Sequence, residues 1–257
     1  MIFSDSIEFF TSIFIVCSAV IIIVLEQIFP YNKGQKIFRE GFFNDFVLYT
    51  LLQSYIAGIC IFYSIRWLQG IGLQSDVNIS SYLSPWQQLI VFIVIHDFYI
   101  YWFHRLQHKS RFLWRIHEAH HSSFEVDWLS GSRSHLFEIL INQTVEFAPL
   151  FLLGASPEVA VYKGMTDAVW GMYIHSNINV KSGFLQYFIN GPEMHRWHHA
   201  NQKKALDKNF STKLAIWDWL FGTAYFPKNE KAGTYGLTRE YPLSFIQQFF
   251  YVFRSRS

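Results

Sequence analysis

The stretch that decides the fold is PWQQLIVFIVIHDFYIYWFHRLQHKSRFLWRIHEAHH, which occupies residues 85–121. It opens with a proline that suits the first turn of a helix, continues through an apolar run to about Phe103, and ends in a row of histidines. An apolar run of this length can form a membrane-spanning helix. The stretch therefore predicts a helix that crosses a bilayer and carries histidines at the end of its span.

The composition of the whole chain also points to a membrane. Of the 257 residues, 51% are hydrophobic and 19% are aromatic, which is unusually apolar for a water-soluble protein. The formal net charge is only +2 and no long block of like charges occurs, so we expect no nucleic-acid partner. The two cysteines, Cys17 and Cys60, lie inside apolar runs and predict neither a disulfide framework nor a thiolate metal site.

Four further apolar stretches accompany the one that ends on the histidines. Residues 7–29 and 43–68 are long enough to cross a hydrocarbon core. Residues 136–153 and 157–174 are shorter or more polar and meet at Gly154, which predicts a hairpin that enters the bilayer only in part. A cleaved signal peptide is the alternative for the first stretch, but the sequence lacks a basic leading region and a clear small-residue cleavage site there. The expected fold is all-α, with multi-span membrane helices.

The distribution of positive charge predicts the orientation of these helices. The loops at 30–42 and 104–133 are rich in lysine and arginine, whereas residues 69–84 contain neither. Because loops rich in positive charge stay on the cytoplasmic side, we expect the N-terminus outside and both the histidine clusters and the C-terminus in the cytoplasm. The same count of spans places all the clusters on one side of the membrane, where they can meet.

All eleven histidines lie between His96 and His199, and eight of them form three clusters. Residues three or four apart share one face of a helix, so each cluster presents its imidazoles together. Neighbours such as His120 and His121 diverge by about 100°, which suits two metal ions better than one. Imidazole binds iron, zinc and copper, and the lack of thiolates disfavours a structural zinc finger. The clusters that predict a binuclear metal centre are HRLQH (His104, His108), HEAHH (His117, His120, His121) and HRWHH (His195, His198, His199).

Three further histidines and several carboxylates stand near these clusters. His175 is expected to be a ligand, the alternative being that it caps its segment or bonds a group beside the metal. His96, about two helical turns before His104, is first interpreted as a hydrogen-bonded structural histidine, the alternative being a metal ligand or a partner of one. For His135 both roles stay open, that of a metal ligand and that of a hydrogen-bond partner of a ligand. Metal-bound histidines usually donate their other ring N–H to a carboxylate or carbonyl, so nearby acids are candidates for that role before they are ligands, unless they are solvated or ion-paired. These acids are Asp97, Glu118, Glu125, Asp127, Glu138 and Glu193.

Together the motifs resemble those of the fatty acid hydroxylase and sterol desaturase superfamily of membrane di-iron enzymes. The resemblance rests on the three histidine clusters, on DFYIYWFHRLQH leading into the first, on the His175-Ser176-Asn177 element, and on NFSTKLAIWDWLFGT after the third. It covers about residues 90–225, which it identifies as a di-iron catalytic domain. The flanking parts are then N-terminal membrane helices at 1–89 and a C-terminal cytoplasmic tail at 226–257.

The resemblance implies a helical cytoplasmic cap whose histidines hold two iron ions, with zinc as a metal that purification can leave in their place. It carries the ligand role to the eight clustered histidines and to His175. It also implies an enzyme that uses O2 as co-substrate, and external electrons, to hydroxylate or desaturate a membrane lipid such as a fatty acyl chain, sterol or ether lipid. The electron donor must be a separate protein, since the sequence has no dinucleotide-binding fingerprint, haem-attachment motif or cysteine array. A cytochrome b5-like or ferredoxin-like donor is implied by the resemblance alone.

Two other classes of protein are the alternatives to a lipid hydroxylase. A membrane zinc-dependent hydrolase is disfavoured because the sequence lacks HExxH and offers more imidazoles than a site with three protein ligands uses. A metal transporter or metal store is disfavoured because transporters place ionisable residues at mid-bilayer, whereas these clusters flank the spans. The sequence therefore favours an oxygen-dependent lipid oxidoreductase.

Overall fold

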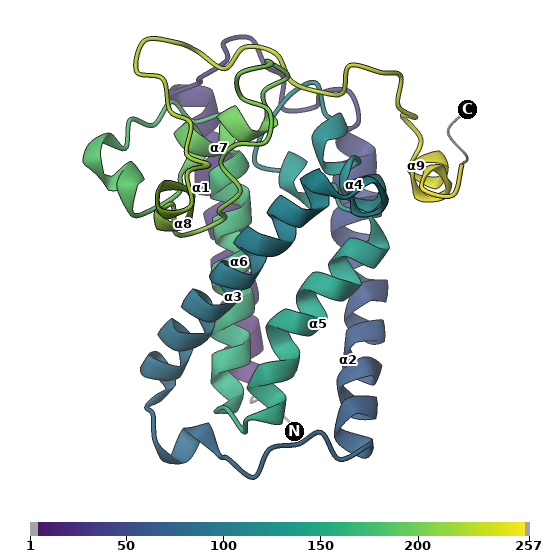
Figure 1. Ribbon diagram of the computed structural model, residues 1–257, viewed down its shortest axis with the longest axis vertical. Coiled ribbons are helices and arrows are strands. Elements are labelled where there is room, and N and C mark those ends of the chain that lie inside the picture. The colour runs from purple at the N-terminus through teal and green to yellow at the C-terminus, as the bar shows by residue number, and fades with distance from the viewer. Residues whose placement is uncertain (1–4, 255–257) are drawn as a thin grey trace.

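The computed structural model describes residues 5–254, and no β-strand forms within that range. The all-α prediction is confirmed. The last three residues of the predicted tail, and the first four of the chain, lie outside the described residues. The helices are α1 (Asp5–Ile28), α2 (Ser54–Gly70), α3 (Pro85–Lys109), α4 (Arg111–His117), α5 (Leu136–Leu152), α6 (Pro157–His175), α7 (Pro192–His199), α8 (Ile216–Leu220) and α9 (Phe245–Tyr251). Helices α1, α2, α3, α5 and α6 form an upright bundle, and most of the shorter segments gather as a cap at the end opposite the start of α1 (Figure 1).

Among the residues that the structure describes, three helical stretches are long and apolar enough to cross a membrane. They are Phe9–Ile28 within α1, Asn44–Gly70, and Pro85–Lys109, and they correspond to three of the predicted spans. The second begins as the π-helix η1 (Asn44–Gln53), which runs directly into α2. The third continues past the end of the apolar run because the polar residues that follow Phe103 keep the helical hydrogen-bond pattern as far as Lys109. His104 and His108 are therefore held on a long helix rather than on a loop.

Helices α5 and α6 form the predicted hairpin, and they pack inside the bundle. Gly154 adopts a φ of +63° at the bend, a conformation that glycine accepts without strain. Leu150 and Val159, on either side of the bend, pack with Leu89 and Phe92 of α3 in one buried cluster. Helix α6 also packs against α1, and α5 against α2. The hairpin thus connects the membrane-spanning helices with the cap.

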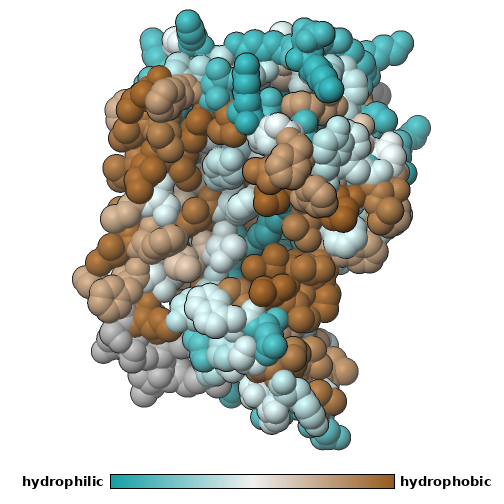
Figure 2. Space-filling view, turned by 90° about the vertical axis from the view of Figure 1, so that its left-hand side faces the viewer, coloured by the Kyte–Doolittle hydropathy of each residue, from teal (hydrophilic) through white to brown (hydrophobic). Residues whose placement is uncertain are grey.

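The outer face of the bundle is apolar. Phe10, Val16, Phe62, Trp67 and Ile90 are each more than half exposed. A water-soluble protein rarely exposes so continuous an apolar surface, whereas hydrocarbon solvates it readily. Figure 2 shows apolar side chains covering much of the flank and hydrophilic ones concentrated at the cap end. The surface therefore matches a protein whose bundle lies in a membrane and whose cap faces water.

The loop after α1 is joined to the cap by buried ion pairs. Arg39 donates from Nε and Nη2 to the two carboxylate oxygens of Asp127, at 2.7 and 2.8 Å. Asp45, which is fully buried, pairs with Arg39 at 2.8 Å and with Arg133 at 2.5 Å. Two arginines that contributed to the predicted orientation are thus neutralised inside the protein. The cytoplasmic placement of the cap stays a prediction.

Candidate metal centre

Nine histidines converge where the long helices reach the cap. Those of the first cluster lie in the last turn and a half of α3, and those of the second extend from the end of α4 into the 3-10 turn η3 (His120–Ser122). His175 is the last residue of α6, and the third cluster lies on α7. Segments far apart in the sequence therefore bring all the predicted ligands to one place.

The nine side chains divide into two groups, in each of which the candidate ligand nitrogens lie within 4.8 Å of one another. His120 and His121, neighbours in sequence, belong to different groups, and so do His198 and His199. Adjacent side chains of a helix or a 3-10 turn point in different directions, so each of these two segments can contribute a ligand to two metal ions. The five-histidine group is His104, His108, His117, His121 and His198, and the four-histidine group is His120, His175, His195 and His199.

Backbone carbonyls fix the protonation of four of these rings. The Nδ1 atoms of His104 and His198 donate to the carbonyl oxygens of Phe210 and Lys208, each at 2.8 Å. In the other group, His120 Nδ1 donates to the Arg133 carbonyl at 3.0 Å and His175 Nδ1 to a carbonyl of its own helix at 2.8 Å. A carbonyl only accepts, so Nδ1 carries the proton in each ring and Nε2 keeps its lone pair.

These Nε2 atoms approach one another closely. The Nε2 atoms of His104 and His117 are 3.1 Å apart, and so are those of His121 and His198. In the four-histidine group, the Nε2 atom of His175 lies 2.9 Å from that of His195. Nδ1 of His104 donates to the Phe210 carbonyl and Nδ1 of His117 to Glu138, so the Nε2 lone pairs of these two rings face each other and repel unless a cation lies between them. The donor set therefore fits two metal ions bound by neutral imidazole, a ligand that suits iron, zinc and copper.

Burial keeps the imidazoles neutral. It lowers the pKa of His120 to about 3, and the neighbouring His175 adds to the effect. Burial, followed by the repulsion of surrounding imidazoles, also lowers the pKa values of His195, His198 and His199 well below their ordinary range. Neutral rings are the form that binds metal, so the pocket holds its ligands ready at physiological pH.

Two carboxylates contact rings of the five-histidine group. Glu138, one of the acids expected near the metal, accepts from His117 Nδ1 at 2.8 Å and from Gln107 Nε2 at 2.8 Å. Asp207 lies 3.4 Å from His108 Nδ1 and was not anticipated. No motif or helical spacing connects Asp207 with a histidine almost a hundred residues earlier, so only the tertiary structure reveals this contact.

His135 and His96 lie outside both groups. His135 caps α5: its Nδ1 accepts from Phe137 N at 3.2 Å, and its Nε2 donates to the Phe249 carbonyl at 3.0 Å. His96 lies deeper along α3 and contacts Lys163 at 3.1 Å. These hydrogen bonds connect His135 and His96 to protein groups other than the nine histidines of the two groups.

The remaining predicted acids hold the backbone and side chains around the centre. Asp97 accepts from the backbone N–H groups of Lys213 and Leu214, at 2.8 Å each. Glu193 accepts from Ser182 N at 2.8 Å. Two further acids form ion pairs: Glu118 pairs with Arg239, and Asp127 pairs with Arg39. Glu125 lies on the surface loop that precedes Asp127.

A glycine sets the space available to the His175 ring. A Cβ atom at Gly131 would lie 2.5 Å from His175 Nδ1 and 2.8 Å from Cε1. We expect Gly131→Ala to displace this ring and to weaken metal binding by the four-histidine group about 10- to 100-fold, the range seen when supports of metal ligands are disturbed. The measurement is metal affinity by equilibrium dialysis. Gly58→Ala is the control, because nothing lies within 4 Å of a Cβ there, and an unchanged affinity for Gly131→Ala would contradict the expectation.

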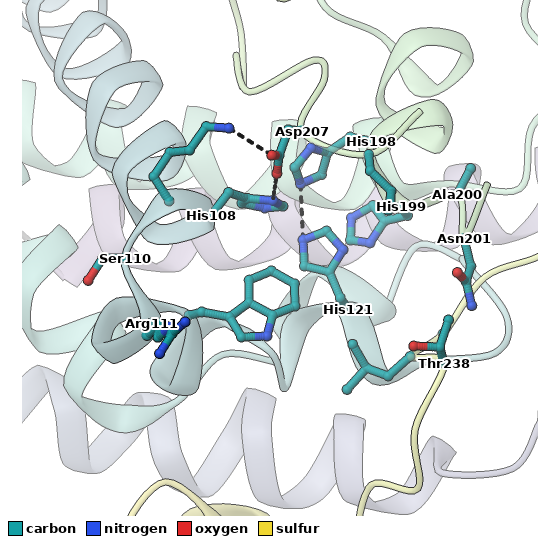
Figure 3. Close-up of a pocket in the computed structure, with 15 residues that line it drawn as sticks. His108, Ser110, Arg111, His121, His198, His199, Ala200, Asn201, Asp207 and Thr238 are labelled. Carbon is teal, nitrogen blue, oxygen red and sulfur yellow. Dashed lines mark hydrogen bonds and ion pairs between the residues drawn. The ribbon is translucent and has the colours of Figure 1, made fainter. Parts of the chain in front are cut away.

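A cavity of about 390 Å³ gives access to both groups. Four of the histidines line it, namely His108, His121, His198 and His199. Figure 3 shows these rings turned toward one another, with Asp207 above His108 and with Asn201 and Thr238 across the cavity. A small molecule can therefore reach the centre without unfolding any part of the cap.

Comparison with known proteins identifies relatives of this chain. Residues 89–223 match the family model for fatty acid hydroxylases. Ornithine lipid hydroxylase OlsE of Rhizobium tropici is 30% identical over 237 residues, which cover 89% of this chain and 71% of that protein. Human alkylglycerol monooxygenase is 34% identical over 155 residues, or 60% of this chain and 34% of that protein. Methylsterol monooxygenase 1-3 of Arabidopsis thaliana is 28% identical over 204 residues, covering 76% and 67% respectively.

The chain thus spans about a third of the length of the human enzyme but most of the bacterial one. No solved structure matches the chain. The family match extends from near the start of α3 through α7 to the segment after α8, and so it contains all nine histidines of the two groups. The chain belongs to the fatty acid hydroxylase family, within the superfamily that also contains the sterol desaturases.

Proposed function

We propose that this chain is a membrane-bound, non-haem di-iron oxygenase that hydroxylates, or desaturates, a C–H bond of a lipid with O2 and external electrons. The observation that carries the proposal is the pair of adjacent all-histidine groups, whose Nε2 atoms approach one another to about 3 Å. The relatives support a lipid substrate, since they are named for ornithine lipid, alkylglycerol and methylsterol. We favour hydroxylation.

The nine clustered histidines are the proposed ligands of two iron ions. When bound, iron supplies the redox chemistry that turns O2 and electrons into an oxidant for an unactivated C–H bond. The protein's own residues do the rest: the carbonyls of Phe210, Lys208 and Arg133 hold ring orientation, and Glu138 holds His117.

The substrate is proposed to approach along α3. Phe98, Trp102 and Leu106 recur every fourth residue and are 40%, 41% and 53% exposed. They form an apolar stripe that leads toward Lys109 at the mouth of the cavity. A lipid that lies in the membrane along this stripe brings carbons near its polar end to the metal centre.

The proposed topology is multi-pass with the cap and the C-terminus in the cytoplasm. The positive loops support it, and exposed lysines such as Lys36 and Lys203 lie beside the cap segments. A separate electron-donor protein would then dock on the cytoplasmic face. Its identity is proposed only as a cytochrome b5-like or ferredoxin-like protein.

The test is mass spectrometry of total membrane lipids from cells that express the chain, grown with isotopically labelled O2. We expect a lipid class that gains one labelled oxygen atom, or loses two hydrogen atoms, only when oxygen and iron are supplied. Cells without the chain are the control. A zinc hydrolase would instead release fatty acid without oxygen, and lipids that stay unchanged with iron loaded and a donor present would overturn the proposal.

A further inference from the structure

A second cluster of ionisable side chains lies inside the bundle, away from both histidine groups. Lys163 on α6 is completely buried, and its ammonium contacts His96 Nδ1 at 3.1 Å, Glu146 Oε1 at 2.5 Å and Asp167. These partners come from α3, α5 and α6. Because His96 precedes His104 by two helical turns, the cluster lies about 12 Å from the metal centre along α3. We call His96, Glu146, Lys163 and Asp167 the ion cluster.

The ion cluster is closed to ligands. Candidate ligand atoms of His96, Glu146 and Asp167 lie within 4.8 Å of one another, a spacing that could serve a metal ion. The Lys163 ammonium contacts all three, however, so its N–H groups find an acceptor in each. The Lys163 ammonium therefore takes the place that a bound metal ion would occupy. Burying charges among apolar helices costs free energy, so we expect the ion cluster to have a specific role.

One contact leads from the ion cluster toward the cap. Asp167 Oδ1 also pairs with Lys213 Nζ at 2.6 Å, and the Lys213 side chain is only 11% exposed. Lys213 belongs to the segment 207–214, between α7 and α8. Asp97, next to His96 on α3, accepts from the backbone N–H groups of Lys213 and Leu214. Helices α3 and α6 therefore hold this segment from the bundle side.

The other part of the same segment supports two metal ligands. The carbonyl of Phe210 accepts from His104 Nδ1 and that of Lys208 from His198 Nδ1, each at 2.8 Å. Asp218 of α8 accepts from the N–H groups of Phe210 and Ser211, at 2.8 Å each. These hydrogen bonds set the tautomer and the direction of both rings, so ring orientation depends on where the segment lies.

We propose that the ion cluster, acting through Lys213, positions the segment 207–214 and thereby sets the metal affinity of the five-histidine group; this inference rests on the proposed metal centre. Lys213 is a positioning residue, since it touches no ligand. The four-histidine group takes its known support from the carbonyls of Arg133 and Gly171, which lie outside the segment. Loss of Lys213 is therefore selective for one of the two metals.

The experiment measures Fe2+ binding by the purified full-length protein in equilibrium dialysis without oxygen or lipid. A parent with His175→Ala and His195→Ala retains the five-histidine group, and a parent with His117→Ala and His121→Ala retains the four-histidine group. In the first parent, Lys213→Met is expected to weaken Fe2+ binding about 10- to 100-fold, and Lys213→Arg, which keeps the charge, to restore most of it. In the second parent, Lys213→Met is expected to leave the affinity unchanged.

Lys203→Met is the matched control, because it removes an exposed lysine that lies outside the segment. The thermal stability of the metal-free proteins is recorded in parallel. Equal weakening in both parents, in step with lost stability, would show that Lys213 is merely structural, and an unchanged affinity in the first parent would also overturn the inference. If the unsubstituted protein oxidises no lipid but the selective loss of Fe2+ binding is found, the proposed function fails and the positioning role stands.

Discussion

Loss of lipid oxidation by roughly a hundred-fold or more is the expected result of the double substitution His120→Ala, His121→Ala. The two side chains are adjacent in sequence but belong to different groups, so the variant removes one imidazole from each metal site. His121 Nε2 lies 3.1 Å from that of His198, and His120 Nε2 lies 3.3 Å from that of His175, so each substitution removes a nitrogen that lies among the other candidate ligands of its group. The measurements are the oxidised lipid per cell and the iron bound per purified chain, and both should fall.

His135→Ala is the control for this prediction. His135 caps α5 and bonds the Phe249 carbonyl, outside both groups. Its loss should cost about 1 kcal/mol of stability, as for other helix caps, and should leave oxidation and iron content close to those of the unsubstituted protein. Equal loss of activity in the two variants would mean that the clustered histidines have no special role.

A large loss of stability is expected for Arg39→Met. The substitution leaves Asp127 and Asp45 buried with fewer partners, and unpaired buried charges of this kind cost about 3–5 kcal/mol. For a chain of this size that corresponds to a fall of roughly 10 °C in Tm, measured by thermal unfolding in detergent. Asp127 also accepts from the N–H groups of Leu129 and Ser130, which precede the carbonyl that supports His120, so iron content should decline as well.

Lys36→Met is the matched control for Arg39→Met. Lys36 lies three residues earlier in the same loop, carries the same charge and is exposed. Its replacement should leave Tm within about 1–2 °C, because exposed charges contribute little to stability. The same Tm for both variants would show that the Arg39 ion pairs do not hold the loop to the cap.

The sequence predicted the architecture well because apolar length alone decides which segments can span a membrane. Residues 7–29 and 43–68 appear as long apolar helices, and Gly154 bends the chain between α5 and α6. The helical end of α3 at Lys109 was harder to predict, since the apolar run stops while good helix formers continue. Hydropathy marks where lipid contact ends, and hydrogen bonding marks where the helix ends.

Residue chemistry also identified the eight histidines of the three clusters, since imidazoles at three- and four-residue spacing share a face, and His175 was predicted separately from its place before Ser176 and Asn177. The division into five and four was not predictable, because it depends on how α7 docks against the turn after α4. The same holds for Asp207 and for the carbonyls of Phe210 and Lys208, whose partners lie far away in sequence. His96 lies on nearly the same face of α3 as His104 but two helical turns farther from the cap, and there its partner is Lys163.

The ion cluster also bears on how the chain is inserted during its synthesis. Helix α6 carries Lys163 and Asp167 near its middle, and each charge at the centre of an isolated helix costs about 2.5–3.5 kcal/mol on insertion into a bilayer. Such a helix does not leave the insertion machinery for lipid by itself. Its partners His96 and Glu146 lie earlier in the chain and have already been made when α6 emerges. In the proposed topology, the order of helices along the sequence therefore provides Lys163 with an acceptor, His96, and a counter-charge, Glu146, before α6 meets hydrocarbon.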